Sequence, residues 1–175
     1  MSQLTDRELL RKHAEGDEHA FEDLYRRHQD KLRAVATRIA GQDADDAFHN
    51  AMIKAWQTAG TFRGDCRVTT WLHRIVVNAS VDITRRRPQC AELPERASSE
   101  ESHRQLMRRM DIRKYWLQLP PDQRVAMLLV DELGYPVDEA ARIVDIPEGT
   151  MKSRCARART RMADKLGHLI GTQSR

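Results

Sequence analysis

Residues 136–166, PVDEAARIVDIPEGTMKSRCARARTRMADKL, constrain the fold more than any other stretch of this 175-residue chain. The spacing of apolar residues predicts a helix over residues 137–144, with Pro136 before it, where a missing N–H costs nothing. Residues 145–147, Asp-Ile-Pro, end that helix because proline disfavours helical geometry in the residue before it. A second helix is predicted over residues 148–166. Two helices that meet at a tight turn are typical of a helix-turn-helix.

The second predicted helix has one apolar side and one basic side. Its apolar residues recur every three or four positions and form one narrow stripe: Met151, Cys155, Ala158, Met162 and Leu166. The opposite side carries polar residues with basic flanks: Thr150, Ser153 and Arg157, then Lys152, Arg154, Arg159 and Arg161. A helix in the DNA major groove needs such a packed back, cationic flanks and outward side chains. The alternative is a solvated basic helix on an ordinary bundle, but the short partner helix and the turn favour DNA binding.

Positive charge is concentrated in this helix. The chain has 30 Lys and Arg against 26 Asp and Glu, a net charge of only +4, yet residues 152–165 hold six basic residues and one acidic residue. Such a patch is more typical of specific nucleic-acid binding than of nonspecific binding by a polycation.

We find no apolar signal peptide and no run of about 18 apolar residues, so we expect a cytoplasmic protein without membrane insertion.

The cysteines and histidines predict no metal site and no cofactor. Cys66, Cys90 and Cys155 are too widely spaced for a zinc pattern, and we expect inert thiols. Asp46 and His49 lie one helical turn apart, but no second ligand pair follows nearby. The chain also has no Gly-rich phosphate loop and no nucleophile motif, so we do not expect an enzyme.

Four helices are predicted before residue 88, with turns at Gly16, Gly41 and Gly60. A capping-box pattern, Thr5-Asp6-Arg7-Glu8, begins the first of them. The third helix is expected to bury Phe48, Met52, Ala55 and Trp56. The fourth, over residues 69–86, should bury Leu72, Ile75, Val76, Ala79 and Ile83, and Trp71 is also assigned to the core. In the second half, Val125, Leu128, Leu129 and Leu133 should point inward.

The segment between the two halves has a different composition. Residues 89–103 include four glutamates, Glu92, Glu95, Glu100 and Glu101, and no apolar period. Aromatic residues make up only 5% of the chain and Gly and Pro are sparse, which favours helices. We therefore predict an all-α protein with two small helical domains, residues 1–88 and 104–175, joined by an acidic linker.

These parts resemble a known family. LPPDQRVAMLLVDELGYPVDEAARIVDIPEGTMKSRCARAR resembles region 4 of the extracytoplasmic function (ECF) sigma factors of bacterial RNA polymerase. Three segments, AFEDLYRRHQDKLRAVATRI, DADDAFHNAMIKAW and FRGDCRVTTWLHRIVVNASVDITRRR, resemble region 2 of the same family. The resemblance implies a promoter-specificity subunit that has no catalysis of its own and lets core polymerase find and melt a promoter.

The resemblance also implies three sets of contact residues. For the −35 element they are Thr150, Lys152, Ser153, Arg154, Arg157 and Arg159, with Arg157 the best candidate for reading a guanine. For the −10 element they are Phe62, Arg63, Gly64, Asp65, Arg74, Asn78, Arg85 and Arg86. For core polymerase they are Asp46, His49, Asn50 and Lys54.

Four positions depart from the family pattern. His49 and Asn50 stand where relatives usually have Gln and an acid, so one ion pair with the polymerase could be weaker. Asp145 stands where relatives often have Gly, although Asp tolerates a left-handed backbone better than most residues. Val130 replaces a basic residue of some relatives.

The implied partners are promoter DNA, the β′ clamp helices and β flap of core RNA polymerase, and an anti-sigma factor. The acidic linker would run toward the polymerase active-site channel. The alternative function is a stand-alone helix-turn-helix transcriptional regulator that binds operators as a dimer. That alternative lacks a heptad seam for dimerisation and leaves the N-terminal half without a role.

Overall fold

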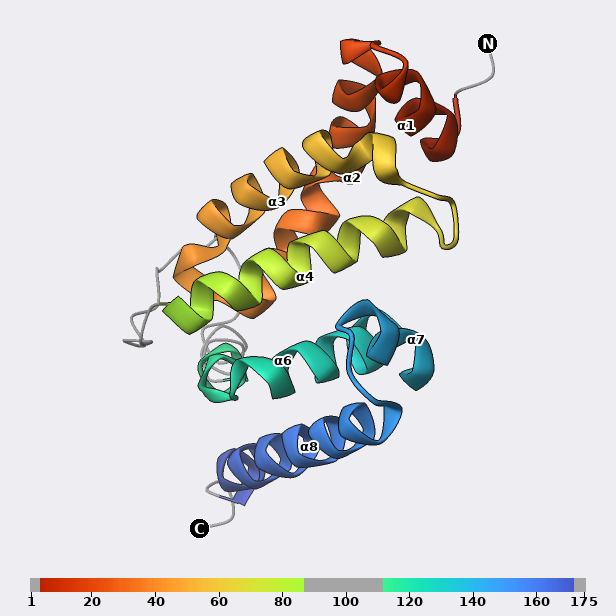
Figure 1. Cartoon of the computed structure of the whole chain (residues 1–175). Helices are drawn as coiled ribbons and strands as arrows, with labels where there is room; N and C mark the ends of the chain where they lie inside the picture. The colour runs from red at the N-terminus through yellow and green to blue at the C-terminus, as the bar shows by residue number, and fades with distance from the viewer. Residues whose placement is uncertain (1–3, 87–111, 172–175) are drawn as a thin grey trace. The chain divides into compact units, whose positions relative to one another are not determined.

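The computed structural model describes residues 4–86 and 112–171, and within these ranges all regular structure is helical (Figure 1). The predicted all-α fold is therefore confirmed. The chain divides into two compact units, Met1–Ile83 and Thr84–Arg175. The acidic linker, residues 89–103, lies outside the described residues, and so do the predicted limits of the two domains, which remain predictions.

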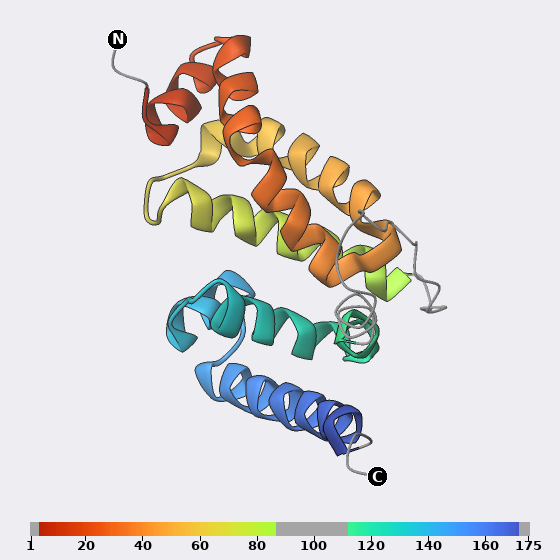
Figure 2. The same ribbon diagram turned by 180° about the vertical axis from the view of Figure 1, so that it is seen from behind.

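The N-terminal unit contains four α-helices: α1 (Asp6–Ala14), α2 (Glu18–Ala40), α3 (Ala44–Thr58) and α4 (Val68–Arg86). Short 3₁₀ turns, η1 (Gly41–Asp43) and η2 (Ala59–Thr61), follow α2 and α3. In Figures 1 and 2, α2, α3 and α4 run alongside one another, and α1 packs against the start of α2 and against η2. The long helices therefore form the bundle, and α1 closes one end of it.

The helix ends of this unit follow the predicted capping signals. The Thr5 hydroxyl accepts a hydrogen bond from the Glu8 N–H, and the Glu8 carboxylate accepts one from the Thr5 N–H. Asp17 caps α2 by accepting from the N–H groups of His19 and Ala20. Gly41 ends α2 with a φ of 61°, which a residue with a Cβ rarely adopts.

Two tryptophans do not lie where the sequence predicted. Phe48, Met52 and Ala55 of α3 are buried as expected, but Trp56 is 50% exposed. The buried face of α3 continues through Ala55 to Ala59, and Trp56 falls beside it, with its ring 5.6 Å from that of His13. Trp71 is only half-buried, because it lies in the first turn of α4, beside Phe62 of the preceding loop.

The C-terminal unit contains a helical stretch over residues 112–118, α6 (Pro121–Met127), the π-helical turn η3 (Leu128–Glu132), α7 (Val137–Ile143) and α8 (Glu148–Gly171). α6 and α7 both pack against α8. The predicted apolar stripe of α8 is buried at Met151, Cys155, Ala158 and Met162. These contacts fix which side of α8 remains exposed.

The turn between α7 and α8 confirms the sequence interpretation. Asp145 has a φ of 54°, the left-handed conformation that Asp tolerates. The carbonyl of Pro147 then accepts hydrogen bonds from the N–H groups of Thr150 and Met151, at 2.9 and 3.1 Å. α7 and α8 therefore form the predicted helix-turn-helix.

Leu133 is a further error in the predicted core, since it is 37% exposed. The N–H of Leu133 bonds to the carbonyl of Leu128, five residues earlier, at 2.9 Å. A π-helical turn adds one residue to the helical repeat, so the residue after it rotates away from the face set by 3.6 residues per turn.

Arg124 is a buried charged residue that the sequence analysis did not single out. It is fully buried and donates to the carbonyls of Leu117 and Leu119, at 3.1 and 3.0 Å. Burial lowers the pKa of Arg124 to about 10, so its guanidinium remains charged at neutral pH. Arg124 thereby ties the end of the 112–118 helix to α6.

Candidate nucleic-acid and polymerase interfaces

The outer side of α8 carries the residues predicted to contact the −35 element. Lys152, Arg157 and Arg159 are exposed, while Thr150, Ser153 and Arg154 are partly exposed. These side chains stand opposite or beside the buried stripe that begins at Met151. The structure therefore gathers all six predicted residues on the accessible side of one helix.

Most cations of this surface face a carboxylate of their own unit. The Arg159 guanidinium holds Asp131 with two hydrogen bonds, Nε–Oδ2 at 3.1 Å and Nη2–Oδ1 at 2.6 Å. Arg154 Nη2 lies 3.0 Å from Asp122 Oδ2, and Lys152 Nζ lies 2.6 Å from Glu148 Oε1. Three cations are thus held in place by anions before any DNA arrives.

Arg157 differs from these three cations. Its Nη2 donates to the Ser153 hydroxyl at 3.3 Å, and it forms no ion pair within the described part of the chain. The hydroxyl of Ser153 in turn donates to the Thr150 carbonyl at 2.9 Å. Arg157 is therefore the guanidinium of this surface that can turn toward a base without breaking an ion pair.

The ion pairs also shift the pKa values of their cations. The hydrogen bond and charge of Asp131 raise the pKa of Arg159, and those of Glu148 raise the pKa of Lys152. Both side chains remain fully charged at neutral pH. Because exposed ion pairs contribute little to stability, a DNA phosphate can replace either carboxylate at small cost.

The residues predicted for the −10 element lie in the loop before α4 and on α4 itself. Arg63 and Asp65 are exposed, and Gly64 between them has a φ of 79°. The ring of Phe62 is half-buried, with its centroid 5.5 Å from that of Trp71. The loop therefore offers polar groups around a partly covered aromatic wall.

On α4, Arg74, Asn78, Arg85 and Arg86 are all exposed. Arg74, Asn78 and Arg85 follow one another at intervals of four and seven residues, which places them on one side of a helix. The opposite side is buried through Leu72, Val76 and neighbouring residues. Asn78 is therefore accessible, as the sequence predicted.

The residues predicted to bind core polymerase, Asp46, His49, Asn50 and Lys54, form an exposed row along α3. Ile53, which the sequence analysis missed, lies in the same row and is 43% exposed. Its position three residues after Asn50 is the signal that could have identified it. This side of α3 therefore presents four polar side chains and one exposed isoleucine.

A pocket of about 350 Å³ lies beside this row, between α2 and α3. Arg33 of α2 crosses it, with Nη1 2.7 Å from Asp45 Oδ1 and the guanidinium 4.9 Å from the Phe48 ring centre. Asp46 and His49 also line the pocket. This side of α3 therefore has a recess with both charges and an aromatic ring.

Within the residues that the structure describes, no three His, Cys, Asp or Glu side chains come together as a metal site. Among the helices of those same ranges, none is long and apolar enough to cross a membrane. Cys66 is exposed and Cys155 is buried, and burial raises the pKa of the Cys155 thiol. Cys90 lies outside the described residues.

The two units match two family models. Residues 24–88 match Sigma-70 region 2, and residues 109–162 match Sigma-70, region 4. Among solved structures, the chain resembles CnrH in complex with the cytosolic domain of CnrY, with a TM-score of 0.67, 25% identity and coverage of 97% of this chain and 99% of that one. It also resembles RpoE of Bartonella quintana in complex with the anti-sigma factor NepR, with a TM-score of 0.65, 25% identity and coverage of 84% and 96%.

Two relatives are similar over almost their whole length. The chain is 43% identical over 169 residues to the ECF RNA polymerase sigma factor SigM of Mycobacterium tuberculosis strain H37Rv. This alignment covers 94% of this chain and 86% of the relative. It is 32% identical over 191 aligned positions to the ECF RNA polymerase sigma-E factor of Escherichia coli K12, covering 96% and 97%. This chain therefore belongs to the ECF sigma factors of RNA polymerase.

Proposed function

We propose that the chain directs RNA polymerase to promoters by reading the −35 element with α8 and the −10 element with the loop before α4. Promoter-directed initiation is the role of the family, and the division of labour between these residues is our proposal. The observation that carries it is the exposed polar side of α8, held outward by the buried stripe from Met151 to Met162. A sigma factor is an initiation factor and not an enzyme, and we propose no catalytic role.

For the −35 element, Arg157 is the leading candidate for direct base readout. A guanidinium can bind guanine O6 and N7 together, and such a pair contributes about 1–3 kcal/mol of discrimination. The long hydrogen bond between Arg157 and Ser153, at 3.3 Å, supports this choice, because that neutral partner can be exchanged for a base. We propose that Lys152, Arg154 and Arg159 exchange their carboxylate partners for DNA phosphates. Thr150 would lie at the edge of this contact.

For the −10 element, melting requires that bases leave the stack, which costs a few kcal/mol per base. Phe62 can offset this cost by stacking, and Asn78 by hydrogen bonds to a base edge. Arg63, Arg74, Arg85 and Arg86 are proposed to hold phosphates. The backbone around Gly64 and Asp65 would supply further polar contacts.

For core polymerase, we propose that the row Asp46, His49, Asn50 and Lys54 on α3 binds the β′ clamp helices. Ile53 in the middle of this row supports a protein contact. The C-terminal unit would contact the β flap.

Since the similar RpoE was solved with an anti-sigma factor, we also propose that an anti-sigma factor regulates this chain. We further propose that the chain acts in the cytoplasm, where RNA polymerase works.

The test is reconstituted transcription with sigma-free core polymerase, followed by mapping of start sites across a genome. Arg157→Ala should reduce transcription from promoters that depend on the −35 element, while Lys165→Ala, a cation near the end of the same helix, serves as the control. Asn78→Ala should spare duplex binding but reduce permanganate reactivity of the −10 bases. Binding of an inverted-repeat operator without polymerase would instead support a stand-alone regulator.

A further inference from the structure

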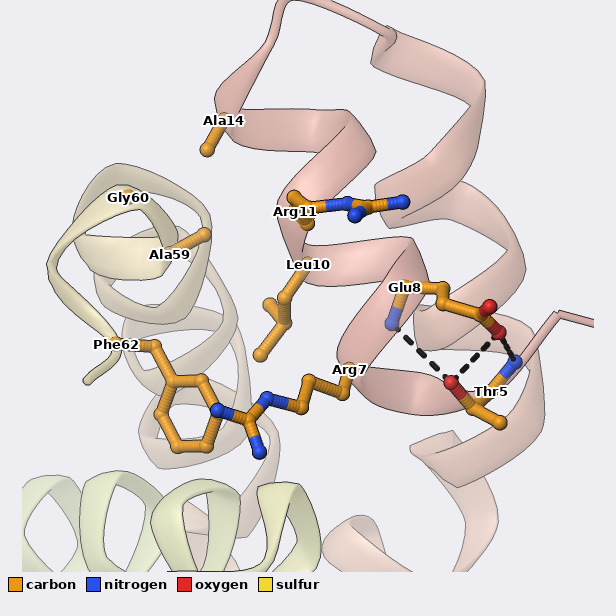
Figure 3. Close-up of a pocket in the computed structure, with 9 residues that line it drawn as sticks. All are labelled: Thr5, Arg7, Glu8, Leu10, Arg11, Ala14, Ala59, Gly60 and Phe62. Atoms are coloured by element: carbon orange, nitrogen blue, oxygen red, sulfur yellow. Dashed lines mark hydrogen bonds between the residues drawn. The ribbon is translucent and has the colours of Figure 1, made fainter. Parts of the chain in front are cut away.

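A pocket of about 410 Å³ lies between α1, the η2 turn and Phe62, at the start of the −10 loop (Figure 3). Its apolar lining includes Leu10, Ala59 and Phe62, and its basic lining consists of Arg7 and Arg11. None of these α1 residues belongs to the surfaces proposed so far. The pocket therefore adjoins the loop and shares Phe62 with it.

Arg7 connects the pocket with the loop. In Figure 3 its side chain extends from α1 toward the ring of Phe62, whereas the guanidinium of Arg11 points away from that ring. A Cβ on Gly64 would lie 2.4 Å from Arg7 Nη2, so the Arg7 guanidinium covers the backbone of this glycine. Arg7 is exposed and forms no ion pair with the residues that the structure describes.

The remaining polar groups of the pocket are engaged. The Thr5 hydroxyl donates to Glu8 Oε2 at 2.7 Å, and the same oxygen accepts the Thr5 N–H at 2.7 Å. These hydrogen bonds lower the pKa of Glu8, with the backbone N–H of Thr5 as the main cause. The Glu8 carboxylate is therefore bound to the helix start, and Arg7 is the strongest unengaged group of the lining.

We propose that this pocket binds one further unstacked nucleotide of the opened promoter strand, adjacent to the nucleotides that the −10 loop holds. The base would lie against Leu10 and Phe62, and its phosphate would bind Arg7, with Arg11 turning inward from its long, exposed pair with Glu15 at 3.8 Å. An aromatic ring with cations beside it is a combination that binds single-stranded nucleic acid. The inference rests on the proposed role of the loop in promoter melting.

The test places a photo-reactive residue, p-benzoylphenylalanine, at one of three exposed positions of the full chain: Ala14 in the pocket, Arg63 in the loop or Arg26 on α2. Each variant is combined with core polymerase and promoter DNA, and crosslinks are mapped in complexes that still initiate transcription. We expect Ala14 to capture one nucleotide of the opened strand, next to those captured from Arg63, and only after melting. We expect no DNA adduct from Arg26.

The outcomes separate the pocket from the loop. Capture from Arg63 but not from Ala14 would overturn the pocket proposal and leave the loop assignment intact. Capture of a polymerase segment from Ala14 would also overturn it, because the occupant would then be protein. Capture from Ala14 alone would support the pocket and remove the loop assignment, and capture from neither position would remove both.

A second measurement uses the lifetime of open complexes after a heparin challenge. Arg7→Ala should shorten this lifetime about fivefold to tenfold, and Arg7→Lys, which keeps the charge, should restore part of it. Arg26→Ala removes an equally exposed cation from α2 and should have no effect. Equal lifetimes for Arg7→Ala and Arg26→Ala would contradict a phosphate contact at Arg7.

Discussion

Three cations of α8 and three cations in and beside the −10 loop differ in whether a carboxylate faces them. On α8, Lys152, Arg154 and Arg159 each face a carboxylate of the same unit. In and beside the −10 loop, Arg63, Arg67 and Arg7 have no such anion among the described residues. These three cations of α8 are paired before DNA binds, and these three cations in and beside the loop are not.

This difference fits the two forms of DNA that a promoter presents. A duplex presents its phosphates at fixed positions, so each paired cation of α8 can exchange its carboxylate for a phosphate where the groove fits. A melted strand has no fixed shape, and cations that are not paired can follow its phosphates. The comparison suggests that α8 is arranged for register, and the loop for capture.

The interiors of the two units show a related contrast. His73 in the N-terminal unit is buried, and burial together with nearby His28 lowers the pKa of His73 to about 4. Arg124 in the C-terminal unit is also buried, but it stays charged and donates to two carbonyls. One unit therefore buries a neutral base, and the other buries a cation.

The largest expected effect is a loss of folding stability at low pH that His73 causes. Below the ordinary pKa of 6.5 the unfolded chain binds a proton that folded His73 does not bind until about pH 4. The free energy of unfolding therefore keeps its full value above about pH 6.5. It decreases by about 3 kcal/mol as the pH falls to about 4. Urea unfolding of wild type and His73→Phe across this range should show a steeper pH dependence for wild type, and parallel curves would contradict the assignment.

The next effect concerns Arg124. Arg124→Met leaves the carbonyls of Leu117 and Leu119 without their donor, and buried carbonyls without a partner cost about 1–3 kcal/mol each. Removal of a buried charge offsets part of this cost, so we expect a net loss of about 2 kcal/mol in the free energy of unfolding. Arg142→Met, an exposed arginine of α7, is the control, and thermal unfolding of both variants provides the measurement.

A third prediction separates the arginines of α8. Arg157→Ala should weaken binding to the −35 element by about 1–3 kcal/mol and relax specificity at one position. Arg159→Ala should weaken binding by less than about 1 kcal/mol and equally for all sequences, since a phosphate contact carries no sequence information. Polymerase holoenzyme binding to a set of −35 variants would measure both, and equal effects would remove the distinction between paired and unpaired cations.

The smallest expected effect follows from Asp131. Asp131→Asn removes the charge that holds Arg159, and an exposed pair of this kind contributes about 0.2–1 kcal/mol. DNA should therefore bind about twofold to fivefold more tightly, with a steeper dependence on salt. Asp138→Asn, which releases Arg142 on α7 instead, should leave binding unchanged. Weaker DNA binding by Asp131→Asn would show that the pair positions Arg159 rather than restraining it.

The sequence alone determined the helices, their caps and the exposed side of α8. These features depend on interactions within a few residues: the capping box at Thr5, the left-handed Asp145, and the three-to-four spacing that buries Met151 and Cys155. The outward positions of Asn78 and Arg157 followed from the same spacing. Local hydrogen bonding and helical periodicity are sufficient for such predictions.

Only the tertiary structure decided which charges are paired and which aromatic residues are covered. Arg159 and Asp131 lie 28 residues apart in the sequence, and the π-helical turn that exposes Leu133 breaks the regular repeat. Trp56 lies beside the buried face of α3 and contacts His13 of α1, which is 43 residues away in the sequence. Local spacing therefore predicted the helices and most of their buried residues, whereas the partners of the surface charges depended on packing between distant segments, which no local pattern encodes.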